Sequence, residues 1–325
     1  MALSRLSGDE QGIILGQLRN TLEPRLAMYF SSASTELRAL LTPAVRQQLR
    51  DDHEVATALC VKTGIRSCKE LREAAEVSCR DKGLSAADLA TLGLLGPVLP
   101  ALEYLWLAER SGSAGPDGLQ RLVEGLIAGA LPAVTHLYLG CMHVGEAGAS
   151  ALAAALDRGA LPRLTDLYLM GAGIGDAELV ALAPALRRRP ALEYLSLFRN
   201  PFGDEGLAAL VAPPPPAGAP PLPTEGLKKL ELLDLRRTKV TDAGCAALAA
   251  ALDSGVLPAL QTLKLSDRRR APALIPASAA AIDAVREALA RSRAVAIASA
   301  ERAAIAESAA PESEAAAPTG VSGSS

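Results

Sequence analysis

Aromatic residues are scarce in this chain of 325 residues, since Phe, Tyr and Trp together make up only 3% of it. Hydrophobic residues nevertheless account for 50% of the sequence, so Leu and Ala must supply most of the interior. The length is sufficient for two domains or for one elongated array of small units.

Cysteine is also rare. The five cysteines are an odd number, lie far apart and form no CxxC pair; they are Cys60, Cys68, Cys79, Cys141 and Cys245. This pattern argues against a disulfide framework and favours reduced thiols in a cytosolic protein. We therefore expect a cytoplasmic protein and leave a nuclear location open.

The sequence has neither a long apolar run nor an excess of basic residues. The acidic pair Asp9 and Glu10 stands where a signal peptide would enter its apolar stretch, and no run reaches the ~18 residues of a membrane span. The net charge is −3, whereas a nucleic-acid partner requires a concentrated basic face. We expect neither a membrane nor a nucleic-acid partner.

Motifs for catalysis are missing as well. The chain has three histidines and none of the patterns GxxxxGK(S/T), HExxH or GxSxG. The run GAGIG at 171–175 lacks the spacing of a dinucleotide loop. Cys141 and His143 are loop positions and His136 is a strand position, so these side chains need not converge on a metal. The sequence predicts no catalytic residue, cofactor or metal site, and it disfavours a hydrolase built on the loops.

What the chain does contain is a repeat of about thirty residues. The run LPAVTHLYL at 131–139 restarts as LPRLTDLYL at 161–169. The pattern LxxLxL recurs along the chain with its first position at Ala74, Leu102, Val134, Leu164, Leu192, Leu230 and Leu260. Alternation within this pattern predicts a short strand with one buried face.

Each strand is predicted to lead into a helix. Residues tolerated as N-caps follow an apolar anchor in four repeats, namely Gly145, Gly175, Gly203 and Thr241. In three of these repeats an aspartate comes next (Asp176, Asp204 and Asp242), which places a carboxylate at the positive end of the helix. Leucines four residues apart then form an apolar stripe.

These units resemble leucine-rich repeats of the ribonuclease-inhibitor type over roughly residues 74–290, with a degenerate first and last unit. The resemblance implies an α/β solenoid bent into a horseshoe arc, with parallel strands on the concave side and helices on the convex side. The Asn/Cys loop position of that family is kept only at Asn200, so we expect the other loops to be less rigid.

Two further segments lie within or after the array. The Pro-rich insertion at 211–226 is predicted to be polyproline-like, and we interpret its similarity to ligands of proline-binding domains as a tolerated surface loop. An Ala-rich helix from about Ile275 is predicted to close the array. Residues 291–325 are then predicted to hold the end of this helix and a disordered tail.

Strand residues between the buried leucines are predicted to be exposed and to form columns on the concave face. Six of the nine aromatic residues fall there: Tyr104, Trp106, Tyr138, Tyr168, Tyr194 and Phe198. Aromatic side chains are enriched in binding hot spots, although they are also a common way to build such strands. The predicted protein-binding surface includes five polar positions: His136, Asp166, Asp234, Arg236 and Lys264.

A helical module precedes the repeats. Within it, Thr42 and Pro43 are predicted to be the N-cap and first residue of a helix that runs through Leu49, and residues 51–72 are predicted to continue as helix. Residues 1–48 resemble an F-box through Leu6, the acidic pair, an apolar run and a turn at 23–25, although the early proline and late tryptophan of that family are absent. The resemblance places contact with a Skp-type adaptor at Leu6, Pro24 and Leu26. The alternative is a cap that shields the first repeat, with connecting helices at 49–73.

The sequence therefore predicts a non-enzymatic protein–protein interaction module. The order of an F-box-like module followed by repeats implies a substrate-recognition subunit of an SCF-type ubiquitin ligase. A regulatory or assembly scaffold without ligase partners is the alternative.

Overall fold

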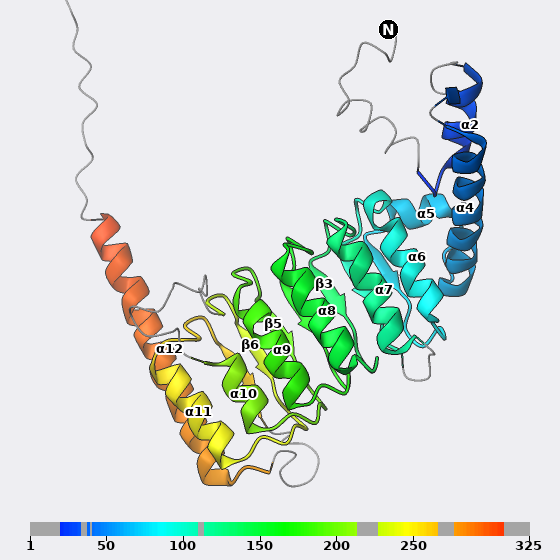
Figure 1. Cartoon of the computed structure of the whole chain (residues 1–325). Coiled ribbons are helices and arrows are strands. Elements are labelled where there is room, and N and C mark those ends of the chain that lie inside the picture. Colours follow the sequence, from blue (N-terminus) through cyan, green and yellow to red (C-terminus); the bar gives the residue numbers. More distant parts are fainter. Residues whose placement is uncertain are drawn as a thin grey trace, which may run out of the picture.

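A computed structural model of the chain describes residues 20–33, 38–39, 41–109, 114–212, 227–265 and 276–308. Within these ranges, seven strands form one parallel sheet whose order follows the chain from β1 to β7. Helices alternate with the strands and cover one side of the sheet, and the units follow one another along an arc (Figure 1). The fold is an α/β leucine-rich-repeat solenoid, so the predicted fold class is confirmed.

The strands each span three residues and begin at regular intervals. They are β1 (Glu76–Ser78), β2 (Tyr104–Trp106), β3 (His136–Tyr138), β4 (Asp166–Tyr168), β5 (Tyr194–Ser196), β6 (Leu232–Asp234) and β7 (Thr262–Lys264). The repeat helices are α6 (Ala86–Leu95), α7 (Gly115–Ile127), α8 (Gly145–Asp157), α9 (Asp176–Arg187), α10 (Asp204–Leu210) and α11 (Asp242–Asp253). A short 3₁₀ helix, η2 (Gly96–Val98), follows α6.

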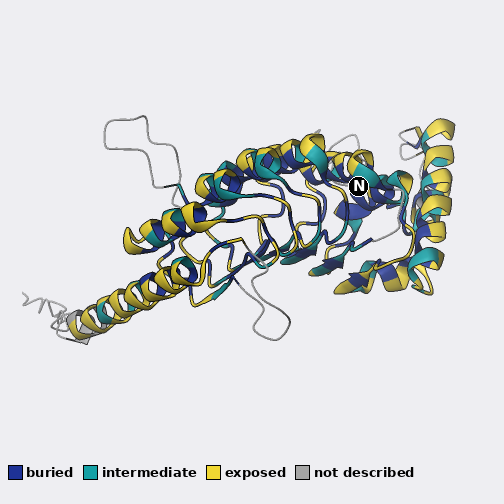
Figure 2. Cartoon of the chain, turned by 90° about the horizontal axis from the view of Figure 1, so that it is seen from below, coloured by how far each residue is buried: buried dark blue, intermediate teal, exposed yellow. Residues whose placement is uncertain are grey.

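The hydrophobic core runs without a break through the stacked units. The central residue of each strand pairs with its equivalent in the next, as Leu137, Leu167 and Leu195 do in β3, β4 and β5. These leucines pack against helix leucines such as Leu152 and Leu182. Figure 2 shows the buried residues between the helices and the strands. Each repeat therefore buries its apolar side chains against its neighbours.

The predicted N-caps Gly175, Gly203 and Thr241 are confirmed. Gly145 instead begins α8, with Val144 at the N-cap position. This shift of one residue leaves the strand-to-helix layout of the repeat unchanged.

The aspartates predicted at the start of the repeat helices connect neighbouring repeats. Asp176 accepts hydrogen bonds from the backbone N–H groups of Gly203 (2.9 Å) and Gly206 (2.7 Å), at the start of the next helix. In the same way, Asp204 accepts from the backbone N–H of Thr241 at 2.8 Å. The carboxylates therefore satisfy unpaired N–H groups of the following helix in addition to lying at the start of their own.

Asn200 holds a loop through a buried network, and only 1% of its surface is exposed. Its Nδ2 donates to the carbonyl oxygens of Leu169 (2.7 Å) and Leu197 (3.0 Å), and its Oδ1 accepts from the backbone N–H of Ile174 at 3.0 Å. At the equivalent position of the next repeat, Thr238 makes a hydrogen bond to the carbonyl of Leu235 at 2.8 Å.

We expect Asn200→Ala to lower the free energy of unfolding by about 2–4 kcal/mol, because several buried backbone groups lose their partners. Thr238→Val is the matched variant, and it should cost only about 1 kcal/mol because one hydrogen bond is lost. Urea unfolding followed by circular dichroism measures both variants. Equal losses would contradict the special role of Asn200.

The N-terminal module contains α2 (Pro24–Ala33), α4 (Pro43–Thr63) and α5 (Cys68–Glu73). Thr42 is the N-cap of α4, as predicted, and its side chain accepts from the backbone N–H of Val45 at 3.3 Å. The helix predicted through Leu49 continues without a break to Thr63. The division placed between residues 48 and 49 therefore falls inside a single helix.

The two halves of α4 belong to different packing units. Leu49, in the first half, joins a small separate cluster with Ala27 and Leu41. Leu59 and Cys60, in the second half, join the continuous core of the array. The second half of α4 and the helix α5 therefore cover the first repeats. Both lie in the segment for which connecting helices were predicted.

The last helix, α12 (Ala279–Ser308), begins a few residues after the predicted Ile275. Its first half is anchored to the array through buried Ile282 and Val285, and Arg291 pairs with Asp253 of α11 at 3.0 and 2.9 Å. Its second half extends beyond the repeats (Figure 1). The predictions for the Pro-rich segment 213–226 and for residues 309–325 lie outside the described residues. Within the described part, none of the helices has the length and apolarity needed to cross a bilayer.

Candidate functional site

The parallel register brings the predicted concave columns together. One column contains Ser78, Trp106, Tyr138, Tyr168, Ser196, Asp234 and Lys264. The neighbouring column contains Tyr104, His136, Asp166, Tyr194, Leu232 and Thr262. The placement predicted for five of the aromatic residues and four of the polar residues agrees with this register, while Phe198 and Arg236 lie two residues after the ends of β5 and β6.

Four of the rings form a stack, which we call the aromatic ladder: Trp106, Tyr138, Tyr168 and Tyr194. The ring centroids of Trp106 and Tyr138 lie 3.2 Å apart, and those of Tyr138 and Tyr168 lie 3.9 Å apart, with interplanar angles of 14° and 12°. Tyr168 and Tyr194 are tilted by 30° at 4.5 Å. Adjacent strands are separated by about 4.8 Å, so aromatic residues repeated at one strand position stack on one another.

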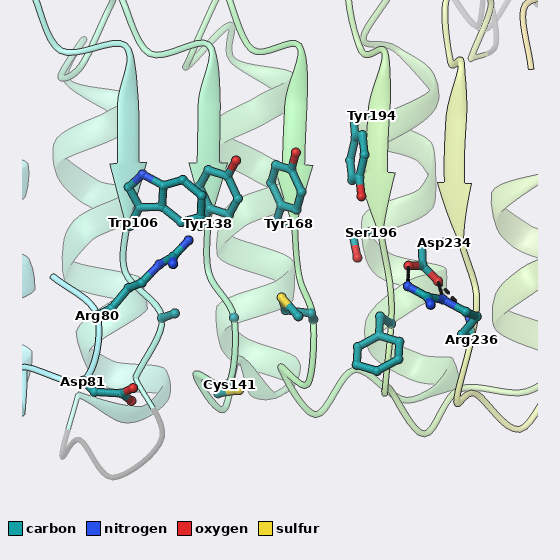
Figure 3. Close-up of a pocket in the computed structure, with 14 residues that line it drawn as sticks. Arg80, Asp81, Trp106, Tyr138, Cys141, Tyr168, Tyr194, Ser196, Asp234 and Arg236 are labelled. Carbon is teal, nitrogen blue, oxygen red and sulfur yellow. Dashed lines mark hydrogen bonds and ion pairs between the residues drawn. The ribbon is translucent and has the colours of Figure 1, made fainter. Parts of the chain in front are cut away.

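Stacking makes the ladder half-buried, whereas the sequence predicted exposed rings. The faces of the rings are used by neighbouring rings, whereas the four residues of the ladder all line the groove (Figure 3). Burial raises the pKa of Tyr138, Tyr168 and Tyr194. These hydroxyl groups therefore stay protonated at neutral pH and act as hydrogen-bond donors, as Tyr168 does toward Asp166.

Cations cover both ends of this surface. The guanidinium of Arg80 lies 3.5 Å from the ring centroid of Trp106 (Figure 3). At the other end, the guanidinium groups of Arg236 and Arg237 lie 5.2 and 5.5 Å from the ring of Phe198. The Nζ of Lys264 lies 5.9 Å from the ring of Tyr194. Such cation–π contacts orient the cations over the rings.

His136 and Asp166 form a polar network beside the ladder. Asp166 Oδ2 lies 3.4 Å from His136 Nε2 and accepts from the hydroxyl of Thr165 at 2.7 Å, while its Oδ1 accepts from the hydroxyl of Tyr168 at 3.4 Å. Tyr104 stacks on His136 with centroids 4.2 Å apart. These predicted site residues therefore also fix one another in position.

Two residues of the predicted exposed column, Ser196 and Asp234, are buried. Asp234 is only 3% exposed, and Arg236 covers it with a bidentate pair at 2.9 and 2.6 Å (Figure 3). The prediction that Asp234 is exposed is therefore wrong, because the paired Arg236 covers its carboxylate. Arg236 is the more exposed member of this pair.

The concave face encloses a groove of about 410 Å³. Its lining is formed by Arg80, Asp81, Trp106, Ala108, Tyr138, Gly140, Cys141, Tyr168, Met170, Tyr194, Ser196, Phe198, Asp234 and Arg236. Small residues form part of its floor: a Cβ atom on Gly140 would lie 3.0 Å from Cγ of Met170. Arg80 was missed because it belongs to the degenerate first repeat, although it stands two residues after a strand, as Ala108 and Gly140 do.

Cys141 is a native reporter of this groove, because it is the one partly exposed cysteine and lies in the groove wall. Burial raises the pKa of the Cys60 and Cys79 thiols to about 12. We expect iodoacetamide to modify Cys141 alone in the folded protein, since thiolate and access are both required. Peptide mass spectrometry identifies the modified residues, and all five cysteines should react in urea. Early modification of Cys60 or Cys79 would contradict the packing described above.

The three residues predicted to contact an adaptor differ in their structural environment. Leu6 is outside the described residues, Pro24 begins α2, and Leu26 is 42% exposed. Pro24 and Leu26 line a second groove of about 480 Å³ together with His53 and Cys68. An ion pair of 2.5 Å between Glu23 and Arg72 and a contact of 2.8 Å between His53 Nδ1 and the carbonyl oxygen of Thr21 attach this segment to α4 and α5.

The glycine-rich run that was compared with a dinucleotide loop has a structural role. The run at 171–175 forms the turn from β4 to Gly175, the N-cap of α9. In the described ranges, no three His, Cys, Asp or Glu side chains gather as a metal ion would require.

Comparison with protein families identifies two segments, residues 190–211 and 226–249, as matches to the family described as Leucine Rich repeat. These segments include β5 with α10, and β6 with most of α11. No curated protein matches the sequence significantly. Leucine-rich repeats are typical of non-enzymatic scaffolds and point to a protein–protein interaction module.

Proposed function

We propose that this protein is a non-enzymatic module that holds a protein partner on its concave face. The aromatic ladder is the observation that carries this proposal. Its rings are fixed in place before binding, so a partner would lose little of their conformational freedom. Ring edges, neutral hydroxyl groups and cations then offer apolar contact and hydrogen bonds side by side.

An enzyme is the competing class of protein, and the contacts around His136 are the relevant observation. The hydroxyl of Thr135 lies 2.8 Å from His136 Nδ1, and Asp166 is on the other nitrogen of the ring. The same hydroxyl bonds the carbonyl of Glu103 at 3.3 Å, and Tyr104 stacks on the imidazole. We interpret the Thr135–His136–Asp166 arrangement as structural, because the hydroxyl and the imidazole are both held by contacts that position the neighbouring rings of the ladder.

A more specific form of the proposal is that the chain is the substrate-recognition subunit of an SCF-type ubiquitin ligase. Support comes from the exposed Leu26, the groove beside Pro24 and the separation of the cluster of Ala27, Leu41 and Leu49 from the core of the array. Leu26 and the groove beside Pro24 then offer a surface to a Skp-type adaptor. A regulatory or assembly scaffold without ligase partners is the second form.

Deletion of residues 1–41 distinguishes these forms, because it retains Thr42 and the whole of α4. Under the ligase proposal, co-purification with a Skp-type adaptor is lost while the concave partner is still captured and the melting temperature falls by only a few degrees. Leu26→Asp in the full chain should also abolish adaptor capture, and Val61→Asp, at another exposed apolar position of the module, is its control. An aggregating deletion would instead indicate a cap, and a full-length chain that captures no adaptor would favour the scaffold.

A further inference from the structure

A shallow hollow of about 370 Å³ lies between the loops that follow β5 and β6. Its lining is Arg199, Asn200, Pro201, Arg237, Thr238 and Lys239. Arg199 and Arg237 hold equivalent positions in the two repeats, and both have left-handed backbone with φ of 57° and 59°. The backbone N–H of Arg199 donates to the carbonyl of Arg236 at 2.9 Å, so the two loops are joined directly.

The hollow carries three positive charges. Arg199, Arg237 and Lys239 are exposed, and none of them forms an ion pair with a carboxylate in the part of the chain that the structure describes. In contrast, Arg236 is neutralised by Asp234. Unpaired cations gathered at one concave site create a potential that attracts an anionic partner.

The hollow lies beside the aromatic groove. Phe198 lines the groove, and the guanidinium of Arg237, which lines the hollow, lies 5.5 Å from its ring. The groove offers apolar surface at Met170 and Phe198, and its carboxylate Asp234 is already paired. An apolar site therefore lies directly beside a cationic site.

Nucleic acid is a poor match for this combination. Single-stranded nucleic acid binds to aromatic residues by stacking its bases on ring faces. In the ladder, those faces are occupied by neighbouring rings and, at Trp106, by Arg80. The chain as a whole also has a net charge of −3.

We infer that the partner enters through an acidic peptide segment that carries a large apolar side chain. The apolar side chain occupies the groove beside Met170 and Phe198, and the carboxylates contact Arg199, Arg237 and Lys239. This inference rests on the proposed function and specifies the chemistry of the partner at the same face. Binding of this kind is steered by charge and weakens as salt rises.

Selection from a random-peptide display library on the full chain tests the inference. The enriched peptides are then synthesised with a fluorescein label, and their affinity is measured by anisotropy at low and high salt. The test variant combines Arg199→Gln, Arg237→Gln and Lys239→Gln. The control combines Arg121→Gln, Arg158→Gln and Arg163→Gln, which removes the same charge from exposed positions outside both sites.

We expect the enriched peptides to combine Asp or Glu with Phe, Trp or Leu. Their affinity should fall about tenfold in the test variant and stay within about twofold in the control, because three exposed charge contacts are lost only in the former. Neutral or basic peptides, or acidic peptides that bind both variants equally, would overturn the inference and leave binding at the concave face intact. Poly(U) that binds more tightly than the peptides would overturn it in favour of nucleic acid. If no peptide is enriched, the inference fails, and capture of a protein partner by the full chain remains the separate test of the proposed function.

Discussion

Leu167→Ala is expected to lower the free energy of unfolding by about 2–5 kcal/mol. Leu167 is the central residue of β4, is fully buried (0% exposed) and pairs in register with Leu137 and Leu195. Strands on both sides and the core leucines beneath fill its surroundings, so the cavity left by the smaller side chain has little room to collapse. Urea unfolding monitored by circular dichroism measures the loss.

The matched control is Leu94→Ala, which makes the same chemical change in α6 at a position that is 66% exposed. Its effect should stay within about 0.5 kcal/mol, as is usual for surface substitutions. Similar losses in the two variants would contradict the assignment of buried and exposed faces in the repeats.

Removal of the aromatic ladder is expected to abolish capture of the concave partner. The variant combines Trp106→Ala, Tyr138→Ala and Tyr168→Ala, and affinity purification followed by mass spectrometry compares it with the unchanged chain. A single aromatic hot spot contributes about 2 kcal/mol or more, so the loss of three should separate bound from unbound partner clearly. The melting temperature should fall as well, because two stacked pairs are lost, but the array should stay folded since its buried leucines remain.

Two further variants show whether the binding surface itself has been removed. Tyr138→Phe with Tyr168→Phe keeps the stacked rings and removes only the hydroxyl groups, so it should retain part of the binding. Tyr29→Ala removes an exposed ring from α2, outside the groove, and should leave capture at the concave face unchanged. A folded triple variant that still captures every partner would show that binding occurs elsewhere.

Sequence reasoning was most successful where one physical rule acts on every repeat. The restart at 131 and 161 defines the register, and this register places Trp106, Tyr138 and Tyr168 in one column. Alternation along a strand then separates buried leucines from concave residues. The same reasoning predicted Thr42 as a helix N-cap, because capping depends on adjacent residues only.

It was least successful where the outcome depends on contacts between distant residues. Asp234 was predicted to be exposed, and the position of the Arg236 side chain buries it. Asp176 was placed at the start of its own helix, and its hydrogen bonds also reach Gly203 in the following repeat. No pattern within one repeat specifies which neighbouring group a side chain reaches.

The sequence by itself determined the α/β repeat architecture, the column of aromatic residues and the concave location of the candidate site. These features follow from local periodicity, since a spacing that recurs along the chain must recur in the stacked structure. Only the tertiary structure decided that ring faces are hidden by neighbouring rings, that Arg80 covers one end of the ladder, and that Arg199, Arg237 and Lys239 gather at one hollow. Those features depend on side-chain directions and on the distance between adjacent repeats, and both are set by packing in three dimensions.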